Sequence, residues 1–221
     1  RLGERLEAGL IDDNLCLGDV RLPQPRPVAV LSAPGGPVLH LESTEPGLQV
    51  YAGDHIRPGA PGLAGLPYRR FAGIALEPQL WPDAPNHPGF PSARLRPGDV
   101  LTHAFRPFPN TPATAQGTVK KVVLEARERG VLFDIGHGKG SFAFKTARAM
   151  LANGFYPDTI SSDIHQLCID GPAFDQVTTM SKFLCMGMSL PDVIAASTVN
   201  AAMALRRPEL GSLKPGSVGD A

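Results

Sequence analysis

The prolines of this chain are unevenly distributed, and that distribution limits the folds it can adopt more than any other feature. Of the 23 prolines, 18 lie in residues 1–112 and five lie in the remaining 109 residues. Proline lacks a backbone N–H donor and interrupts the interior of a helix. The first part is therefore expected to be rich in turns and poor in helix, while the second part can alternate helices with strands.

Short apolar runs separated by turn sequences characterise the first part. Turns rich in glycine and proline occur at residues 33–36 and 45–47. The apolar runs are four or five residues long and cover residues 27–31, 38–41, 48–51 and 73–76. Runs of this length, bounded by turns, predict antiparallel strands.

The second part alternates expected strands with expected helices. The strands are predicted at residues 99–105, 131–135 and 159–164. Helical spacing and capping residues predict helices at 119–129, 141–152, 180–187 and 191–205. Such alternation favours a parallel α/β layer, in which functional side chains gather at the carboxyl ends of the strands.

Charge and cysteine content exclude several classes of protein. The 21 basic and 21 acidic residues give a formal net charge of zero, so neither nucleic acid nor a membrane surface is an expected partner. No apolar run is long enough to span a bilayer, and the first residues lack the apolar stretch of a signal peptide. Three widely spaced cysteines indicate free thiols in a reducing compartment, and we expect a cytoplasmic protein.

Polar residues follow three of the expected parallel strands. His103 and His137 come at the ends of the first two strands, and Asp163 comes at the end of the third. Two imidazoles and a carboxylate at one rim could hold a divalent metal ion, whereas a single histidine there is more often a hydrogen-bonded structural residue. The glycine-rich segment 136–141 fits neither a dinucleotide fingerprint nor a phosphate-binding loop, because Ser141 and Gly140 occupy key positions.

Three segments of the first part resemble the C-terminal part of the aldose 1-epimerases. They read IDDNLCL at 11–17, EPGLQVYAG at 45–53 and LEPQLWPDAPNHP at 76–88, and the resemblance covers about residues 3–98. It implies a large antiparallel β-sandwich, with Glu77 as the catalytic base and with Asp12 and Gln49 as sugar-hydroxyl contacts. The acid histidine of that family lies upstream of the matching stretch, and Pro78 replaces the hydroxyl residue that usually follows the base.

The rest of the chain resembles the amidohydrolase superfamily, in particular its dihydroorotase-like deacetylases. The matching stretches include LTHAF at 101–105, FDIGHG at 133–138, ISSDIH at 160–165 and TTMSKF at 178–183. This resemblance covers about residues 95–221 and implies the later strands of a (β/α)₈ barrel. It makes His103 and His137 metal ligands and Asp163 a metal-binding proton shuttle, with zinc as the expected metal. The family's first-strand histidine pair and its bridging lysine lie upstream of the matching region.

These observations predict a mixed fold: a partial antiparallel β-sandwich over residues 1–98, followed by an α/β half of a TIM-type barrel over 99–221. The two resemblances meet at residues 95–99, which suggests a recombinant or misassembled gene or a truncated fusion. The expected activity is metal-dependent hydrolysis of an amide or ester bond, impaired by the absent half of the barrel. The alternatives are sugar mutarotation or carbohydrate binding by the first part, and a non-catalytic remnant. The expected partner is a small sugar or acylated molecule, and the uncovered barrel face could be buried in a homo-oligomer, covered by the sandwich, or left poorly ordered.

Overall fold

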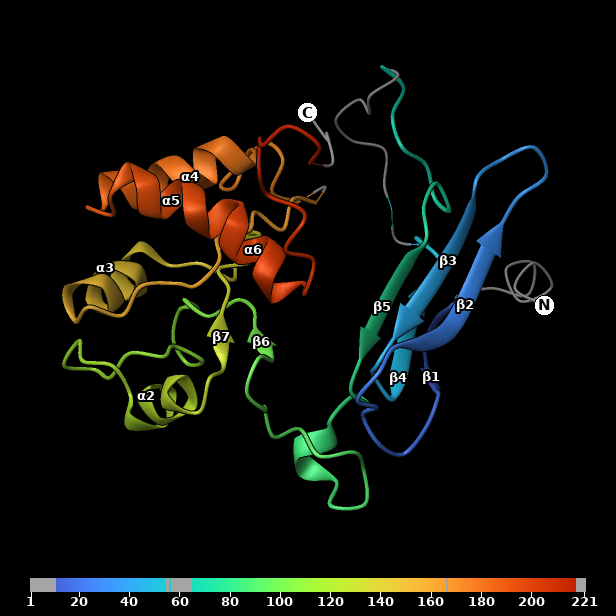
Figure 1. Ribbon diagram of the computed structural model, residues 1–221, viewed down its shortest axis with the longest axis horizontal. Helices are drawn as coiled ribbons and strands as arrows, with labels where there is room; N and C mark the ends of the chain where they lie inside the picture. Colours follow the sequence, from blue (N-terminus) through green and yellow to red (C-terminus); the bar gives the residue numbers. More distant parts are fainter. Residues whose placement is uncertain (1–10, 55, 57–64, 166, 218–221) are drawn as a thin grey trace. The chain divides into compact units, whose positions relative to one another are not determined.

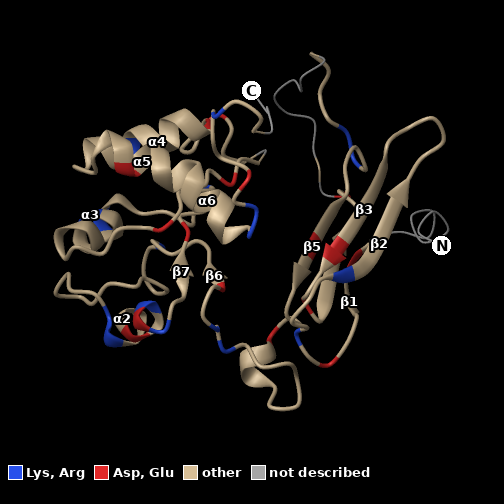
Figure 2. Cartoon of the chain, in the orientation of Figure 1, with Lys and Arg blue, Asp and Glu red and all other residues tan. Residues whose placement is uncertain are grey.

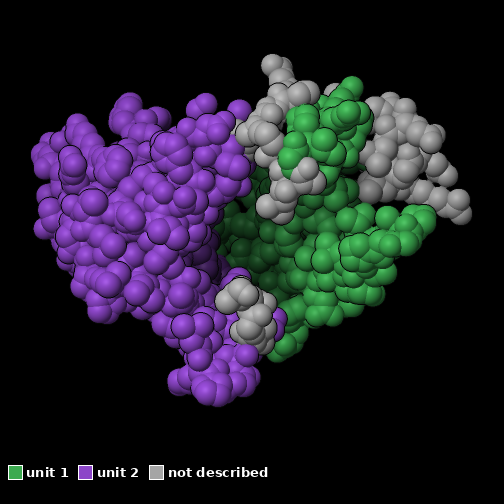
Figure 3. All heavy atoms as spheres, turned by 90° about the horizontal axis from the view of Figure 1, so that it is seen from above, with its two compact units in different colours: residues 1–94 green, residues 95–221 purple. Residues whose placement is uncertain are grey.

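A computed structural model describes residues 11–54, 56, 65–165 and 167–217 of the chain. The chain divides into two compact units, residues 1–94 and residues 95–221 (Figure 3). Each unit has its own cluster of buried apolar side chains, and the two are described separately below.

Antiparallel strands dominate the described part of the first unit (Figure 1). One sheet has the order β1-β4-β5, and β2 and β3 form a separate hairpin. The bounds are β1 Asp12–Cys16, β2 Arg26–Ser32, β3 Val38–Ser43, β4 Gly47–Tyr51 and β5 Ala75–Gln79, followed by a short 3₁₀ turn at Ala84–Asn86. The prediction of antiparallel strands is therefore confirmed.

Two strands of this unit differ from the sequence-based expectation. β1 was not predicted, because its polar sequence DDNLC has little intrinsic preference for a strand. It forms through pairing with β4, where all five residues of β1 have a cross-strand partner. β5 begins at Ala75 and extends to Gln79, whereas the apolar run predicted residues 73–76. Ile11, Leu48 and Val50 are buried in the core of this unit.

The second unit contains a short parallel pair of strands and five helices among its described residues (Figure 1). The bounds are β6 Val100–Leu101, α2 Lys121–Glu128, β7 Leu132–Phe133, α3 Phe144–Ala152, α4 Gln176–Cys185, α5 Leu190–Ser197 and α6 Val199–Ala204. A parallel bridge between Asp134 and Thr159 extends the pairing to a third segment. The parallel pairing was predicted, but the strands are much shorter than expected.

Two expected helices also have different limits, each for a local reason. α4 begins at Gln176 because the Asp175 carboxylate accepts a hydrogen bond from the Thr178 N–H, which caps the helix. This hydrogen bond lowers the pKa of Asp175. The expected helix 191–205 is divided into α5 and α6 at Thr198, whose hydroxyl donates to the Ile194 carbonyl at 2.7 Å.

The core of the second unit lies between the strands and the helices. Phe105, Phe133, Ile135 and Phe183 are at most 1% exposed, and helices α3, α4 and α5 contribute buried residues to the same cluster. None of the helices in the described segments is long and apolar enough to cross a membrane. Charged residues of both signs are mixed on α2, where Lys121 lies 3.4 Å from Glu125 (Figure 2).

A buried carboxylate joins the three segments of the parallel layer. Asp134 is 7% exposed and accepts hydrogen bonds from the hydroxyls of Thr102, Thr159 and Ser161 at 2.6, 2.7 and 2.6 Å. Hydrogen bonds to an ionised acceptor are stronger than those between neutral groups. Asp134 therefore fixes the relative position of the chain after β6, the chain after β7 and residues 159–161.

We predict that Asp134→Ala lowers the free energy of unfolding of the second unit by about 3 kcal/mol, because the hydroxyls of Thr102, Thr159 and Ser161 all lose their acceptor. The measurement is urea unfolding followed by helical circular dichroism, since every α-helix in the described residues belongs to this unit. Trp81, the single tryptophan of the chain, reports on the first unit by fluorescence. Asp170→Ala, at an exposed position, is the control and should change the value by less than about 0.5 kcal/mol. An unchanged urea midpoint in Asp134→Ala would contradict this role.

Candidate functional site

The three polar residues predicted at strand ends follow segments that lie side by side. β6 and β7 are parallel, and hydrogen bonds continue beyond the strands, from Ala104 N–H to the Asp134 carbonyl and from His137 N–H to the Ser161 carbonyl. The carboxyl ends of the three segments therefore share one edge. His103, His137 and Asp163 all belong to the chain at this edge, as the sequence pattern predicted.

His103 and Asp163 are brought together. The Nε2 atom of His103 lies 4.0 Å from Oδ2 of Asp163, and their side chains are 29% and 43% exposed. On the other side of the imidazole, Nδ1 of His103 lies 2.6 Å from the Gly136 carbonyl oxygen. Since a carbonyl only accepts, Nδ1 carries a proton, and Nε2 is the ring nitrogen that faces Asp163. An imidazole nitrogen and a carboxylate, both partly exposed to solvent, thus lie together at this edge.

His137 is held in a different environment. It is 1% exposed, stacks on Phe142 with ring centroids 4.5 Å apart, and donates from Nδ1 to the Gly138 carbonyl at 2.9 Å. Its Nε2 accepts a hydrogen bond from the Lys182 ammonium at 2.8 Å. Burial, together with the positive charge of Lys182, lowers the pKa of His137, so the neutral ring is favoured.

Lys182 reaches this histidine from helix α4. Its ammonium also donates to the Pro172 carbonyl, and burial lowers the pKa of Lys182. Lys182 belongs to the stretch 178–183 that resembles the amidohydrolases, but its sequence context alone predicted no role for it. Even a partly buried ammonium is costly unless it is hydrogen-bonded, so these two acceptors explain how the ammonium is accommodated.

The backbone around this edge adopts an unusual conformation. Gly136 and Gly138 have φ values of 46° and 50°, and the non-glycine residues His103 and Asp163 have φ values of 56° and 46°. A Cβ atom on Gly138 would lie 2.6 Å from Oδ2 of Asp163, so the carboxylate packs directly against the glycine backbone. Left-handed conformations are costly for side chains with a Cβ and concentrate at functional sites. The strain therefore marks His103 and Asp163 as candidate functional residues.

The fit of a metal ion to these residues is partial. Across residues 11–54, 56, 65–165 and 167–217, no three His, Cys, Asp or Glu side chains lie close enough together to hold a metal. His103 and Asp163 fit as two ligands, because Nε2 faces a carboxylate and Nδ1–H is held by a carbonyl, as is common for metal-binding histidines. His137, as arranged, is occupied by Lys182. The three-ligand site remains a prediction.

The first unit places its three predicted site residues on one face of its sheet. Gln49 pairs with Asn14 of β1 and with Glu77 of β5, and Asp12 lies two residues from Asn14 on the same face. The Gln49 amide donates to Asp12 Oδ1 at 2.6 Å, and Glu77 is exposed. The opposite face carries the buried side chains of this unit. Asp12, Gln49 and Glu77 therefore form a polar row on the face away from the core.

Asn14 of β1 lies on the same sheet face as this row, but it was not predicted as a site residue. Both polar atoms of its side chain are buried and have no hydrogen-bond partner. A Cβ atom on Gly47 would lie 2.9 Å from Asn14 Oδ1 and 3.1 Å from Trp81, so both side chains pack around this glycine. The indole N–H of Trp81 donates to the Pro46 carbonyl at 3.0 Å. Asp12 and Asn14 are two residues apart, so a predicted strand here would have placed both side chains on one face. β1 itself was not predicted.

Comparison with known proteins gives different relatives for different stretches of the chain. The model of the aldose 1-epimerase family matches residues 1–106, just under half of the chain. A mouse galactose mutarotase is 37% identical over 92 residues, which is 42% of this chain and 27% of the relative. A deacetylase from Agrobacterium fabrum is 38% identical over 112 residues, which is 51% of this chain and 28% of the relative.

A solved structure is also similar to part of this chain. The crystal structure of an adenine deaminase superposes with a TM-score of 0.53 at 35% identity, covering 57% of this chain and 34% of that chain. The chain thus spans about a third or less of each of these relatives. It contains an aldose-epimerase-like N-terminal region and has amidohydrolase-like relatives.

The strained backbone predicts an unusual order of stability among variants of Asp163. Asp163→Gly should unfold with a free energy about 1 kcal/mol higher than Asp163→Ala, because glycine relieves the left-handed strain that alanine retains. The same pair of substitutions at Ser162, which lacks a positive φ, should give the opposite order, since glycine there adds only unfolded-state entropy. Urea unfolding followed by helical circular dichroism measures both pairs. Equal stability of the two Asp163 variants would show that this backbone is not strained.

Proposed function

We propose that residues 95–221 are the later part of a (β/α)₈-type barrel and that their strand ends form a metal-dependent hydrolase site for an amide or ester bond. The observation that carries the proposal is the pair of His103 and Asp163, held 4.0 Å apart on strained backbone at the end of a parallel layer. The deacetylase and adenine deaminase relatives support this class of chemistry.

A divalent metal, with zinc the expected ion, would supply a Lewis acid at this edge. His103 and Asp163 would hold it, and His137 would join them once the Lys182 ammonium leaves Nε2. The Gly136 carbonyl would keep the His103 ring in the tautomer that ligation needs. Asp163 would take a proton from the attacking water and give it to the leaving nitrogen or oxygen.

Little turnover is expected from this chain alone. The described residues supply two available ligands and a third that is hydrogen-bonded to a lysine. Catalytic groups that act as a unit lose most of their rate when one member is missing. A non-catalytic remnant is therefore the alternative that an activity assay must separate from an active hydrolase.

Zinc binding is the direct test of the proposed site. A chelating-dye competition should show weak binding that falls on the order of tenfold in His103→Ala, Asp163→Asn and His137→Ala. Lys182→Met should strengthen binding, because it releases Nε2 of His137. His40→Ala, which removes an exposed histidine of the first unit, is the matched control and should have no effect. Identical zinc affinity in the original chain and His103→Ala would rule the site out.

Hydrolysis of N-acetyl and O-acetyl substrates in the presence of zinc or manganese tests the expected impairment. Turnover should be far below ordinary enzyme values, which are on the order of 10 per second. A rate near that value would show that the site is complete, and it would overturn the expectation of impairment while retaining the hydrolase class.

A second candidate function, sugar binding or mutarotation, concerns the first unit. It is favoured by the polar row of Asp12, Gln49 and Glu77 on one sheet face and by the match to the aldose 1-epimerase family. Glu77 would act as the base at the anomeric hydroxyl, while Asp12 and Gln49 would orient the sugar. The hydrogen bond between Gln49 and Asp12 would fix both side chains for this purpose.

We predict weak galactose binding without appreciable mutarotation. Gln49→Ala and Asp12→Ala should weaken binding about tenfold, since each removes hydrogen bonds to the sugar. Calorimetry measures binding and polarimetry measures mutarotation. Glu42→Gln, at an exposed position on β3, is the control. Galactose affinity that is the same in Gln49→Ala and in Glu42→Gln would remove the polar row from consideration.

A further inference from the structure

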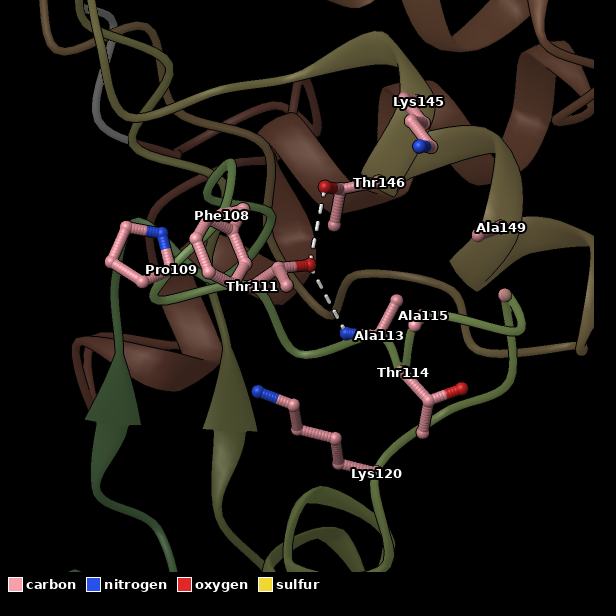
Figure 4. Close-up of a pocket in the computed structure, with 11 residues that line it drawn as sticks. Phe108, Pro109, Thr111, Ala113, Thr114, Ala115, Lys120, Lys145, Thr146 and Ala149 are labelled. Atoms are coloured by element: carbon pink, nitrogen blue, oxygen red, sulfur yellow. Dashed lines mark hydrogen bonds between the residues drawn. The ribbon is translucent and has the colours of Figure 1, made fainter.

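A cavity of about 410 Å³ lies in the second unit and is formed by residues outside the strand-end site (Figure 4). Its walls come from the loop 108–117, from Lys120 immediately before α2, and from Lys145, Thr146 and Ala149 of α3. A volume of this size is within the range of small-molecule sites. Neither proposed function assigns a role to this cavity.

The charged side chains that line the cavity are all positive. Lys120 and Lys145 line it, and no acidic residue does. Within the described part of the chain, neither ammonium has a carboxylate partner. Figure 4 shows the two lysines on opposite sides of the cavity, with Lys145 above and Lys120 below in that view. The cavity therefore favours an anion.

The remaining polar side chains of the wall are already engaged. Thr111 and Thr146 lie 3.3 Å apart at their hydroxyls, and Thr146 also donates to the Arg106 carbonyl. The Thr111 hydroxyl accepts from the Ala113 N–H, and Thr114 bonds the Thr118 hydroxyl at 2.8 Å. These hydroxyls hold the loop and helix together, so the lysines are the side chains left to bind a ligand.

An exposed aromatic ring occupies one side of the cavity. Phe108 is 86% exposed although it is a large apolar residue, and Pro109, Ala115 and Ala149 add further apolar surface. A planar apolar group of a ligand would cover the Phe108 ring and remove this surface from water. The wall thus combines two positive charges with an apolar, aromatic side.

The start of α3 adds to the preference for an anion. Lys145 and Thr146 belong to its first turn, which contains no acidic residue, and no side chain caps the helix at Ala143. The positive end of the helix dipole therefore reinforces the charge of Lys145 instead of being neutralised locally.

We propose that this cavity binds a small aromatic anion, which is attracted by the positive charges of Lys120 and Lys145 and places its ring against Phe108. The site is separate from His103, His137 and Asp163, none of which lines it. Its existence does not depend on either proposed activity.

Phenyl phosphate is the probe, with inorganic phosphate and phenol as its two halves. Amide NMR spectra of the ¹⁵N-labelled full chain should show saturable shifts in residues 108–117 and 144–149, with a dissociation constant on the order of 1 mM. Each half alone should bind at least about fivefold more weakly, because the anion and the ring use different parts of the wall. Shifts confined to other residues, or inorganic phosphate binding as tightly as phenyl phosphate, would overturn the proposal.

Matched variants separate the two contributions. Lys120→Met and Lys145→Met should each weaken phenyl phosphate binding about threefold, and the double variant about tenfold. Phe108→Ala should weaken phenyl phosphate binding but leave inorganic phosphate binding unchanged. Lys121→Met is the control, because its side chain is 89% exposed on α2 and does not line the cavity. An unchanged dissociation constant in the folded double variant, verified by circular dichroism, would also overturn the proposal.

Discussion

The buried carboxylate of Asp134 is the interaction on which the second unit depends. β6 and β7 each contain only two residues, and the third segment pairs through a single bridge, so backbone hydrogen bonds alone hold this layer weakly. Asp134 compensates with three charge-assisted hydrogen bonds, one to Thr102 and two to residues 159 and 161. Since His103 follows Thr102 directly and Asp163 follows Ser161 by two residues, the same carboxylate also sets the spacing of the candidate functional residues.

This arrangement explains why strain can persist at the strand ends. Left-handed conformations at His103 and Asp163 each cost on the order of 1 kcal/mol and survive only where surrounding contacts fix the chain. Asp134 fixes it on one side, and the core packing of Phe105 and Ile135 fixes it on the other. The glycines at 136 and 138 let the backbone approach both residues closely. The geometry of the edge therefore follows from a stable layer beneath it.

Much of this structure could be predicted from sequence, and the failures have physical causes. Proline distribution and short apolar runs predicted the antiparallel strands at 26–32, 38–43 and 47–51, because apolar runs of this length bounded by turns are typical of strands. The strand expected at 99–105 ends at Leu101, because His103 adopts a positive φ that no apolar pattern reveals. The sequence places His103, His137 and Asp163 after three predicted strands, and their roles as metal ligands stay a prediction. The role of Lys182 rests on its hydrogen bond to His137, which is 45 residues away in the sequence, and a local sequence pattern does not predict such a contact. Asp134 was identifiable in principle, since a charge within the apolar segment 131–135 must find partners when buried.

The two units position polar side chains by different means, and this has a consequence for both proposed functions. In the first unit, strand alternation and cross-strand register align Asp12, Gln49 and Glu77, so the row exists wherever the sheet β1-β4-β5 forms. In the second unit, His103 and Asp163 depend on tertiary contacts, and His137 depends further on where the Lys182 ammonium lies. Neutral His137 and the Lys182 ammonium satisfy each other, so recruiting His137 as a ligand must break a partly buried hydrogen bond and find a new acceptor for the lysine. That cost opposes metal binding even when the other two ligands are in place. In the proposed metal site, Lys182, more than the distance between His103 and Asp163, would therefore control whether the strand-end residues can form a three-ligand centre.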